Sequence, residues 1–274
     1  MQALRVILVC SQEFQLKLWT KSPVTMQRSL SRSSRAQSQG QGIAMFSCRA
    51  SYEDLTHERR ERLKVSVLDS LACAINALGA APTVACVEQA KQFGGSDAQC
   101  TLIGGGNANV IYAASANTAL VRYVDLMDSY LGPVSLCHPS DNVGAVLAAC
   151  EHAGRSGKEF LTALAVAYQV ESELTSVAPF MEEGFDLTTP LSFSIGAGAS
   201  KALQLDEAKT AAAVEICGDV IPLLVVRTTP ISQWKGLNSS QTALSSMHGV
   251  FLASRRLGIR VGRTVRGGLC GVWF

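Results

Sequence analysis

Residues 157–175 read GKEFLTALAVAYQVESELT and belong to a set of alanine-rich stretches that decide the fold of this chain. Alanine has the highest helix propensity of all residues, and its small side chain lets neighbouring helices approach closely. Ser156 stands directly before the stretch and is a residue type that caps helix N-termini. The sequence therefore predicts a helix here, packed among others of the same kind.

Comparable alanine-rich patterns surround this segment on both sides. They cover residues 109–127, 141–154, 190–203, 206–217 and 238–256. Asp141, Thr189 and Asp206 stand at or beside the starts of three of them and are suitable N-cap residues. Apolar residues make up 47% of the chain and charged residues 17%, which indicates a well-buried body. Because few alternating, strand-like patterns intervene, we expect an all-α domain with a single core.

Further helices are expected upstream. An apolar stripe begins after Thr56 and ends near Gly79; it consists of Leu63, Val67, Leu68, Leu71, Ala72, Ile75 and Leu78. Spacing of three and four residues is typical of an amphipathic helix, and a shorter helix fits residues 83–92. The glycines at 104–106 match neither G-x-G-x-x-G nor the lysine-bearing phosphate loop, so a plain turn is favoured there.

The two ends of the chain differ from its body. Residues 1–50 carry seven basic residues, one acid and many serines, which is typical of either a mitochondrial targeting leader or a merely disordered one. We therefore expect a mitochondrial or a cytoplasmic protein. The body at 51–258 is net acidic, which argues against nucleic-acid binding. Residues 259–274 are basic and glycine-rich and predict an irregular tail.

Cysteines and histidines give little support for a metal site. The nine cysteines are scattered without a C-x-x-C pair, so most should be reduced and buried as small core residues. There are only four histidines to join them as ligands. The long uncharged run at 98–121 contains several glycines and asparagines, so no membrane span is expected there.

Residues 123–142 hold the most informative polar side chains. Asp125 and Asp128 are three apart, which would place both carboxylates on one face at the end of a helix. Pro139 directly follows His138 and restricts the backbone, so the imidazole should sit on a rigid turn that leads into a helix. Rigid placement suits proton transfer by a general base. The alternative is that the acids decorate a helix end and the histidine caps a loop.

A second polar cluster follows the apolar run at 220–226. Arg227 and Lys235 emerge at the edge of buried structure, where a cation can bind a carboxylate strongly; a solvated loop with two ordinary surface cations is the alternative. A third candidate is Asp186, in a turn ahead of Thr188, which could equally do no more than begin a helix.

Four motifs in these stretches resemble the MmgE/PrpD family, which includes 2-methylcitrate dehydratase and cis-aconitate decarboxylase. They are D-L-M-D-S-Y-L at 125–131, C-H-P-S-D-N at 137–142, G-F-D at 184–186 and W-K-G at 234–236. The resemblance covers about residues 52–258. The H-P-S-D-N motif with its upstream D-x-x-D is the most specific part.

The resemblance implies a large all-helical domain that bears most of the active site, and a smaller α+β lid domain supplied by later sequence. It also implies a homodimer and no metal or organic cofactor. Relatives continue past Leu257 and Gly258 into the lid, whereas this chain turns into its basic tail. We therefore expect the lid to be largely missing.

By matching position, the resemblance makes Asp128 and His138 pocket residues and Lys235 the lysine of the helical domain. In the mechanism that we expect, His138 is the catalytic acid/base, Asp128 orients its ring, and Lys235 binds a substrate carboxylate. Asp125 would be a further pocket residue, and Arg227 is a possible second carboxylate-binding cation. The expected activity is that of a lyase which dehydrates a small polycarboxylate such as 2-methylcitrate.

Asp186 bears on the choice of reaction, because it stands where decarboxylase relatives carry a histidine and dehydratases an aspartate. This match favours dehydration and makes Asp186 a candidate substrate-binding residue. A cis-aconitate decarboxylase-like lyase and a truncated, non-catalytic helical protein are the alternatives.

Overall fold

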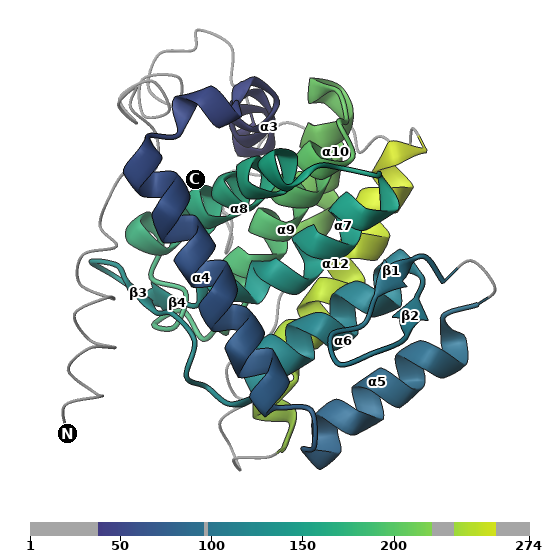
Figure 1. Cartoon of the computed structure of the whole chain (residues 1–274). Coiled ribbons are helices and arrows are strands. Elements are labelled where there is room, and N and C mark those ends of the chain that lie inside the picture. The colour runs from purple at the N-terminus through teal and green to yellow at the C-terminus, as the bar shows by residue number, and fades with distance from the viewer. Residues whose placement is uncertain (1–37, 96–97, 221–232, 256–274) are drawn as a thin grey trace, which may run out of the picture.

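The computed structural model describes residues 38–95, 98–220 and 233–255, which form a helical body with two short hairpins (Figure 1). Its α-helices are α3 (Gln39–Arg49), α4 (His57–Asn76), α5 (Ala81–Phe93), α6 (Val110–Tyr123), α7 (Asn142–His152), α8 (Gly157–Val177), α9 (Thr189–Ala202), α10 (Glu207–Cys217) and α12 (Asn238–Ser254). Short 3-10 helices are η1 (Tyr52–Asp54), η2 (Pro139–Asp141) and η3 (Gln233–Gly236). The antiparallel hairpins pair β1 (Cys100–Thr101) with β2 (Asn107–Ala108), and β3 (Tyr130–Leu131) with β4 (Leu136–Cys137). The all-α prediction is confirmed.

Helix α8 lies in the core and packs along α9. It begins as its sequence predicts, because Ser156 and Glu159 form a capping box. Tyr168 on this helix is fully buried. The crossing with α9 is close: a Cβ on Gly198 would lie 2.8 Å from the Cβ of Ala167. Small residues therefore set the distance between these two helices.

Helix α6 runs against α7 and α12 and brings together the elements that form the site (Figure 1). The approach of α6 to α7 depends on Gly144, where an added Cβ would lie 2.4 Å from the backbone nitrogen of Thr118. Helix α6 ends at Tyr123, η2 begins α7, and η3 leads into α12. The site is thus assembled from three helix termini.

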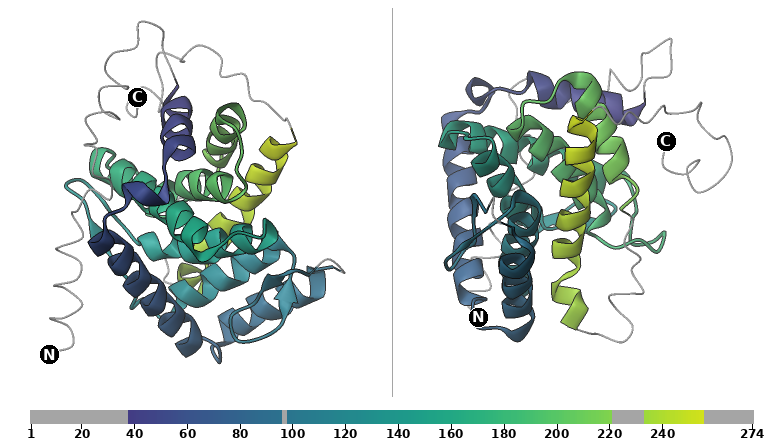
Figure 2. Two further views of the ribbon diagram at one scale, coloured as in Figure 1. Left: turned by 45° about the horizontal axis from the view of Figure 1, so that its top comes forward. Right: turned by 90° about the vertical axis from the view of Figure 1, so that its right-hand side faces the viewer.

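Helix α3 corrects the expected N-terminal boundary of the body. Residues 39–49 were assigned to the leader, yet they form a helix that packs on α10, as the two views of Figure 2 also show. Ile43 is buried against Val170 and Val214, and the Ser38 hydroxyl donates to Glu215 at 2.7 Å. Composition alone groups this helix with the basic segment before it, because its only charged residue is Arg49. The tail at 259–274 lies outside the described residues.

The glycines at 104–106 form the turn between β1 and β2, as predicted. All three have positive φ angles, of 95°, 120° and 95°, which L-residues rarely adopt. The backbone nitrogen of Leu102 donates to the carbonyl of Gly106 at 2.9 Å and closes the loop.

The seven cysteines in the described part of the chain are free thiols, and five of them are buried. Cys10 and Cys270 lie outside it. No single helix of the described segments has the length and apolarity to cross a bilayer, although α4 and α5, taken together as a bent pair, meet both requirements.

Candidate active site

The first feature of the site is the abrupt end of α6. The sequence suggested a helix to residue 127, but α6 ends at Tyr123, and Asp125 has a left-handed backbone with φ of 55°. A residue in this conformation terminates a right-handed helix, and aspartate tolerates it better than most residues. Asp125 and Asp128 therefore do not share a helix face, and the chain turns sharply between them.

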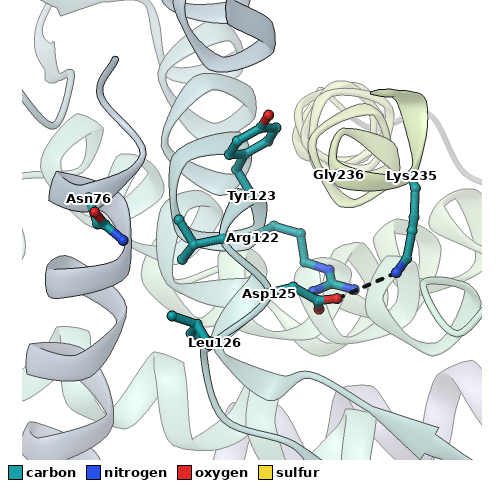
Figure 3. A pocket seen from close by; sticks show the side chains of 8 residues that line it. Asn76, Arg122, Tyr123, Asp125, Leu126, Lys235 and Gly236 are labelled. Carbon is teal, nitrogen blue, oxygen red and sulfur yellow. Dashed lines mark hydrogen bonds and ion pairs between the residues drawn. The ribbon is translucent and has the colours of Figure 1, made fainter. Parts of the chain in front are cut away.

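A pocket of about 540 Å³ lies at this turn (Figure 3). Its wall is formed by Asn76 of α4, by Arg122 to Leu126 around the end of α6, and by Lys235 and Gly236 of η3. Asp125 occupies the middle of the charged part of this wall. Its Oδ1 accepts a hydrogen bond from Nη1 of Arg122, and its Oδ2 lies 3.5 Å from Nζ of Lys235. One carboxylate thus bridges two cations from elements far apart in sequence.

The charge state of Asp125 reflects these neighbours. Partial burial raises its pKa, but the hydrogen bond and charge of Arg122, followed by the charges of His138 and Lys235, outweigh burial, so the pKa of Asp125 is lowered. His138 is not among the residues that line the pocket. The charge of the imidazole nonetheless contributes to the lowered pKa of Asp125.

Arg122 was missed by the sequence analysis. Only 4% of its side chain is exposed, and its Nε lies 3.6 Å from Oδ2 of Asp141, which also accepts a 2.6 Å hydrogen bond from the Ser239 hydroxyl. Asp141 was expected to cap α7, but its side chain makes no capping bond and faces Arg122 instead. The available signal was that Arg122 is the first charged residue after the uncharged run at 98–121.

Burial acts on Asp141 as well. Desolvation raises its pKa to about 7, although the charge of Arg122 and the hydrogen bond from Ser239 act in the opposite direction. The nearby charges of Asp128 and Asp125 also raise it. The interior beside the pocket therefore holds more carboxyl groups than the one guanidinium of Arg122 can neutralise.

His138 is half-buried at the start of η2, and its ring is held by the main chain. Its Nδ1 lies 2.9 Å from the backbone carbonyl oxygen of Asp128 and 3.2 Å from the hydroxyl of Ser129. Because a carbonyl oxygen only accepts hydrogen bonds, Nδ1 carries the proton in the neutral ring and Nε2 is the basic nitrogen. The expected orienting role thus falls to the Asp128 backbone instead of its carboxylate.

The Asp128 carboxylate supports the turn itself, since its Oδ1 accepts a hydrogen bond from the backbone nitrogen of Ser140 at 2.9 Å. Burial raises the pKa of Asp128, while the Ser140 bond and the Tyr168 hydroxyl act against this. Glu171 of α8 is fully buried nearby and accepts a hydrogen bond from Nδ2 of Asn142, and burial holds its pKa well above the ordinary range.

The remaining predicted residues fall elsewhere. Asp186 is fully buried and is not on the pocket wall; its Oδ1 accepts hydrogen bonds from the backbone nitrogen and the hydroxyl of Thr188, at 3.0 and 2.9 Å. Asp186 thus supports the turn before α9, and its expected contact with the substrate stays a prediction. Arg227 lies outside the described residues.

Taken together, the site offers an imidazole with a defined tautomer and two cations that already hold one carboxylate. Such a set can bind carboxylates and move a proton to or from a carbon beside them. Within the described part of the chain, no three histidine, cysteine, aspartate or glutamate side chains gather as metal ligands.

Comparison with known proteins shows the family of this chain. The sequence profile of the MmgE/PrpD N-terminal domain matches residues 41–258, and the chain belongs to the MmgE/PrpD family. It is also similar to a 2-methylcitrate dehydratase-like protein of Aspergillus oryzae, with 25% identity over 209 residues. The match covers 68% of this chain and 41% of that relative, so the chain spans about two fifths of its length.

Proposed function

We propose that this protein acts as a lyase that removes water from a small polycarboxylate of the 2-methylcitrate type. The observation that carries the proposal is the position of Asp125, whose carboxylate is bound by Arg122 and Lys235 and feels the charge of His138. These groups match the needs of a citrate-like substrate, which carries several carboxylates and an acidic carbon beside one of them. Family membership and the name of the fungal relative support the same class of reaction.

In the proposed reaction Lys235 binds one substrate carboxylate and fixes the molecule next to His138. Nε2 of His138 removes the proton from the carbon adjacent to a carboxylate, the electrons of that bond form a carbon–carbon double bond, and the neighbouring C–O bond breaks. The departing hydroxyl takes up a proton from solvent and leaves as water, and the imidazolium returns its proton to solvent. The carbonyl of Asp128 stabilises the imidazolium that forms, because it accepts a hydrogen bond from Nδ1.

The test is the dehydration of 2-methylcitrate by the 274-residue chain, followed through the ultraviolet absorption of the conjugated double bond that forms. We expect turnover by the wild type and a loss of roughly 10²–10⁴-fold in kcat for His138→Gln. Turnover that His138→Gln leaves unchanged would overturn the role of the imidazole. Absence of turnover by the wild type would overturn the dehydratase proposal for this chain.

A parallel assay with cis-aconitate separates dehydration from decarboxylation. The proposed lyase releases no carbon dioxide from cis-aconitate. Release that depends on His138 would replace dehydration by the decarboxylase alternative. His152→Gln is the matched control, because its ring packs edge-on against Phe251 and is not part of the candidate site.

A further inference from the structure

Arg122 is one of the two cations that hold Asp125, and it is not among the site residues that the sequence predicted. Nη1 of Arg122 contacts one oxygen of the Asp125 carboxylate, and Nζ of Lys235 lies 3.5 Å from the other. Figure 3 shows the three side chains converging. Two cations converging on one carboxylate in a pocket wall form a carboxylate-binding geometry. We propose that Arg122 is the second carboxylate-binding cation of this pocket and acts together with Lys235. The identity of the substrate class rests on the proposed function.

Arg122 is held in place for such a role. Its side chain is almost fully buried, its Nε faces Asp141 at 3.6 Å, and its Nη1 lies 3.6 Å from Sδ of Met127. Asp141 is itself held by the Ser239 hydroxyl. The guanidinium presents a fixed fork of donors, which loses little freedom when a carboxylate binds. Arg122 is nonetheless among the residues that line the pocket.

The Asp125 carboxylate occupies the position that a substrate carboxylate would take. Its side chain is 48% exposed, and so is 41% of that of Lys235, so their ion pair is largely screened by water and exchanges readily. A substrate carboxylate therefore competes with Asp125 for the two cations. It follows that Asp125→Asn should bind a tricarboxylate more tightly than the wild type, because the internal competitor is neutralised while both cations remain.

The experiment measures the Kd of citrate, the probe, by calorimetry. Removal of Arg122 alone would leave Asp141 buried without its partner and could unfold the protein. The informative comparison is therefore Asp141→Asn against the double variant Arg122→Met with Asp141→Asn, which differ only at Arg122. We expect citrate to bind the double variant about tenfold or more weakly, the loss typical of one charge-assisted hydrogen bond. Lys235→Met should also bind citrate more weakly than the wild type does.

Arg155→Met is the control for loss of an arginine. Arg155 donates to the carbonyl of Ala202 and pairs with Glu159, and it is not part of the pocket, so its variant should bind citrate like the wild type. Equal citrate affinities of the single and double variants would overturn the inference, as would a wild type that does not bind citrate. Unfolding midpoints show whether each variant is folded. If the double variant is unfolded, Arg122→Gln in the Asp141→Asn background decides, because glutamine removes the charge but keeps a polar side chain; unchanged citrate affinity then overturns the inference.

Binding and turnover separate this inference from the proposed function. If citrate binding depends on Arg122 but 2-methylcitrate is not dehydrated, the proposed function fails and the carboxylate site stands. If dehydration occurs and the affinity for citrate does not depend on Arg122, only the inference about Arg122 fails.

Discussion

Nε of Arg122 and Oδ2 of Asp141 lie 3.6 Å apart in the interior, with 4% and 2% of the two side chains exposed. The pair joins the last turn of α6 to the start of α7. Breaking a buried ion pair by removing one partner is strongly destabilising, whereas an intact pair contributes little net stability. The pair's importance is therefore geometric, since it holds the cation that reaches the pocket.

The first prediction concerns the pH dependence of stability. Burial raises the pKa of Asp141 to about 7 in the folded protein, above the ordinary value of about 4 for an aspartate. Between these values the folded protein keeps a proton that the unfolded chain has lost, so the free energy of unfolding should fall as pH rises from about 4 to about 7, by up to about 1.4 kcal/mol per pH unit from this group. Asp128 and Glu171, whose pKa values are also raised, act in the same direction.

Urea unfolding at pH 5 and at pH 7 checks this expectation. Asp141→Asn should show a smaller difference between the two conditions than the wild type, because the titrating group is gone. An identical difference in both proteins would show that Asp141 does not titrate in this range.

The second prediction concerns the orientation of His138. Because the Asp128 backbone carbonyl holds Nδ1, Asp128→Asn keeps that contact. We expect kcat within about tenfold of wild type, against the 10²–10⁴-fold loss expected for His138→Gln. Nitrogen NMR of the imidazole should find the proton still on Nδ1. A change of tautomer in Asp128→Asn would assign the orienting role to the carboxylate after all.

The third prediction concerns the contact of α6 with α7. Gly144→Ala would place its Cβ 2.4 Å from the backbone nitrogen of Thr118, so the helices must separate. We expect a loss of about 1–3 kcal/mol in the free energy of unfolding. Gly157→Ala is the matched control, since a Cβ there meets nothing within 4 Å and should be neutral or slightly stabilising. Equal stability of the two variants would contradict the close contact.

The fourth prediction tests whether α3 belongs to the folded body. Ile43 is 4% exposed and packs with Val170 and Val214, so Ile43→Ala should lower the free energy of unfolding by about 2–5 kcal/mol. Arg49→Ala, on the exposed side of the same helix, should stay within about 0.5 kcal/mol of wild type. If Ile43→Ala leaves the free energy of unfolding unchanged, α3 does not belong to the folded body.

Helix positions could be predicted well because they depend on local sequence. Asp206 and Ser156 cap α10 and α8 as expected, and the predicted ranges fall within a few residues of the observed ones at most ends. The exception at the end of α6 has a local cause that composition does not reveal, the left-handed backbone of Asp125. Homodimerisation and a mitochondrial or cytoplasmic location stay predictions.

The amino-acid sequence alone was enough to determine an alanine-rich helical fold and a short set of polar residues around His138, because helix propensity, capping and motif spacing act over a few residues. Only the tertiary structure decided which of these groups meet. It brought Arg122 and Lys235, which are 113 positions apart in the chain, to one carboxylate, and it placed Asp186 in a separate turn. Such encounters depend on how whole helices pack, and no local pattern in the sequence encodes them.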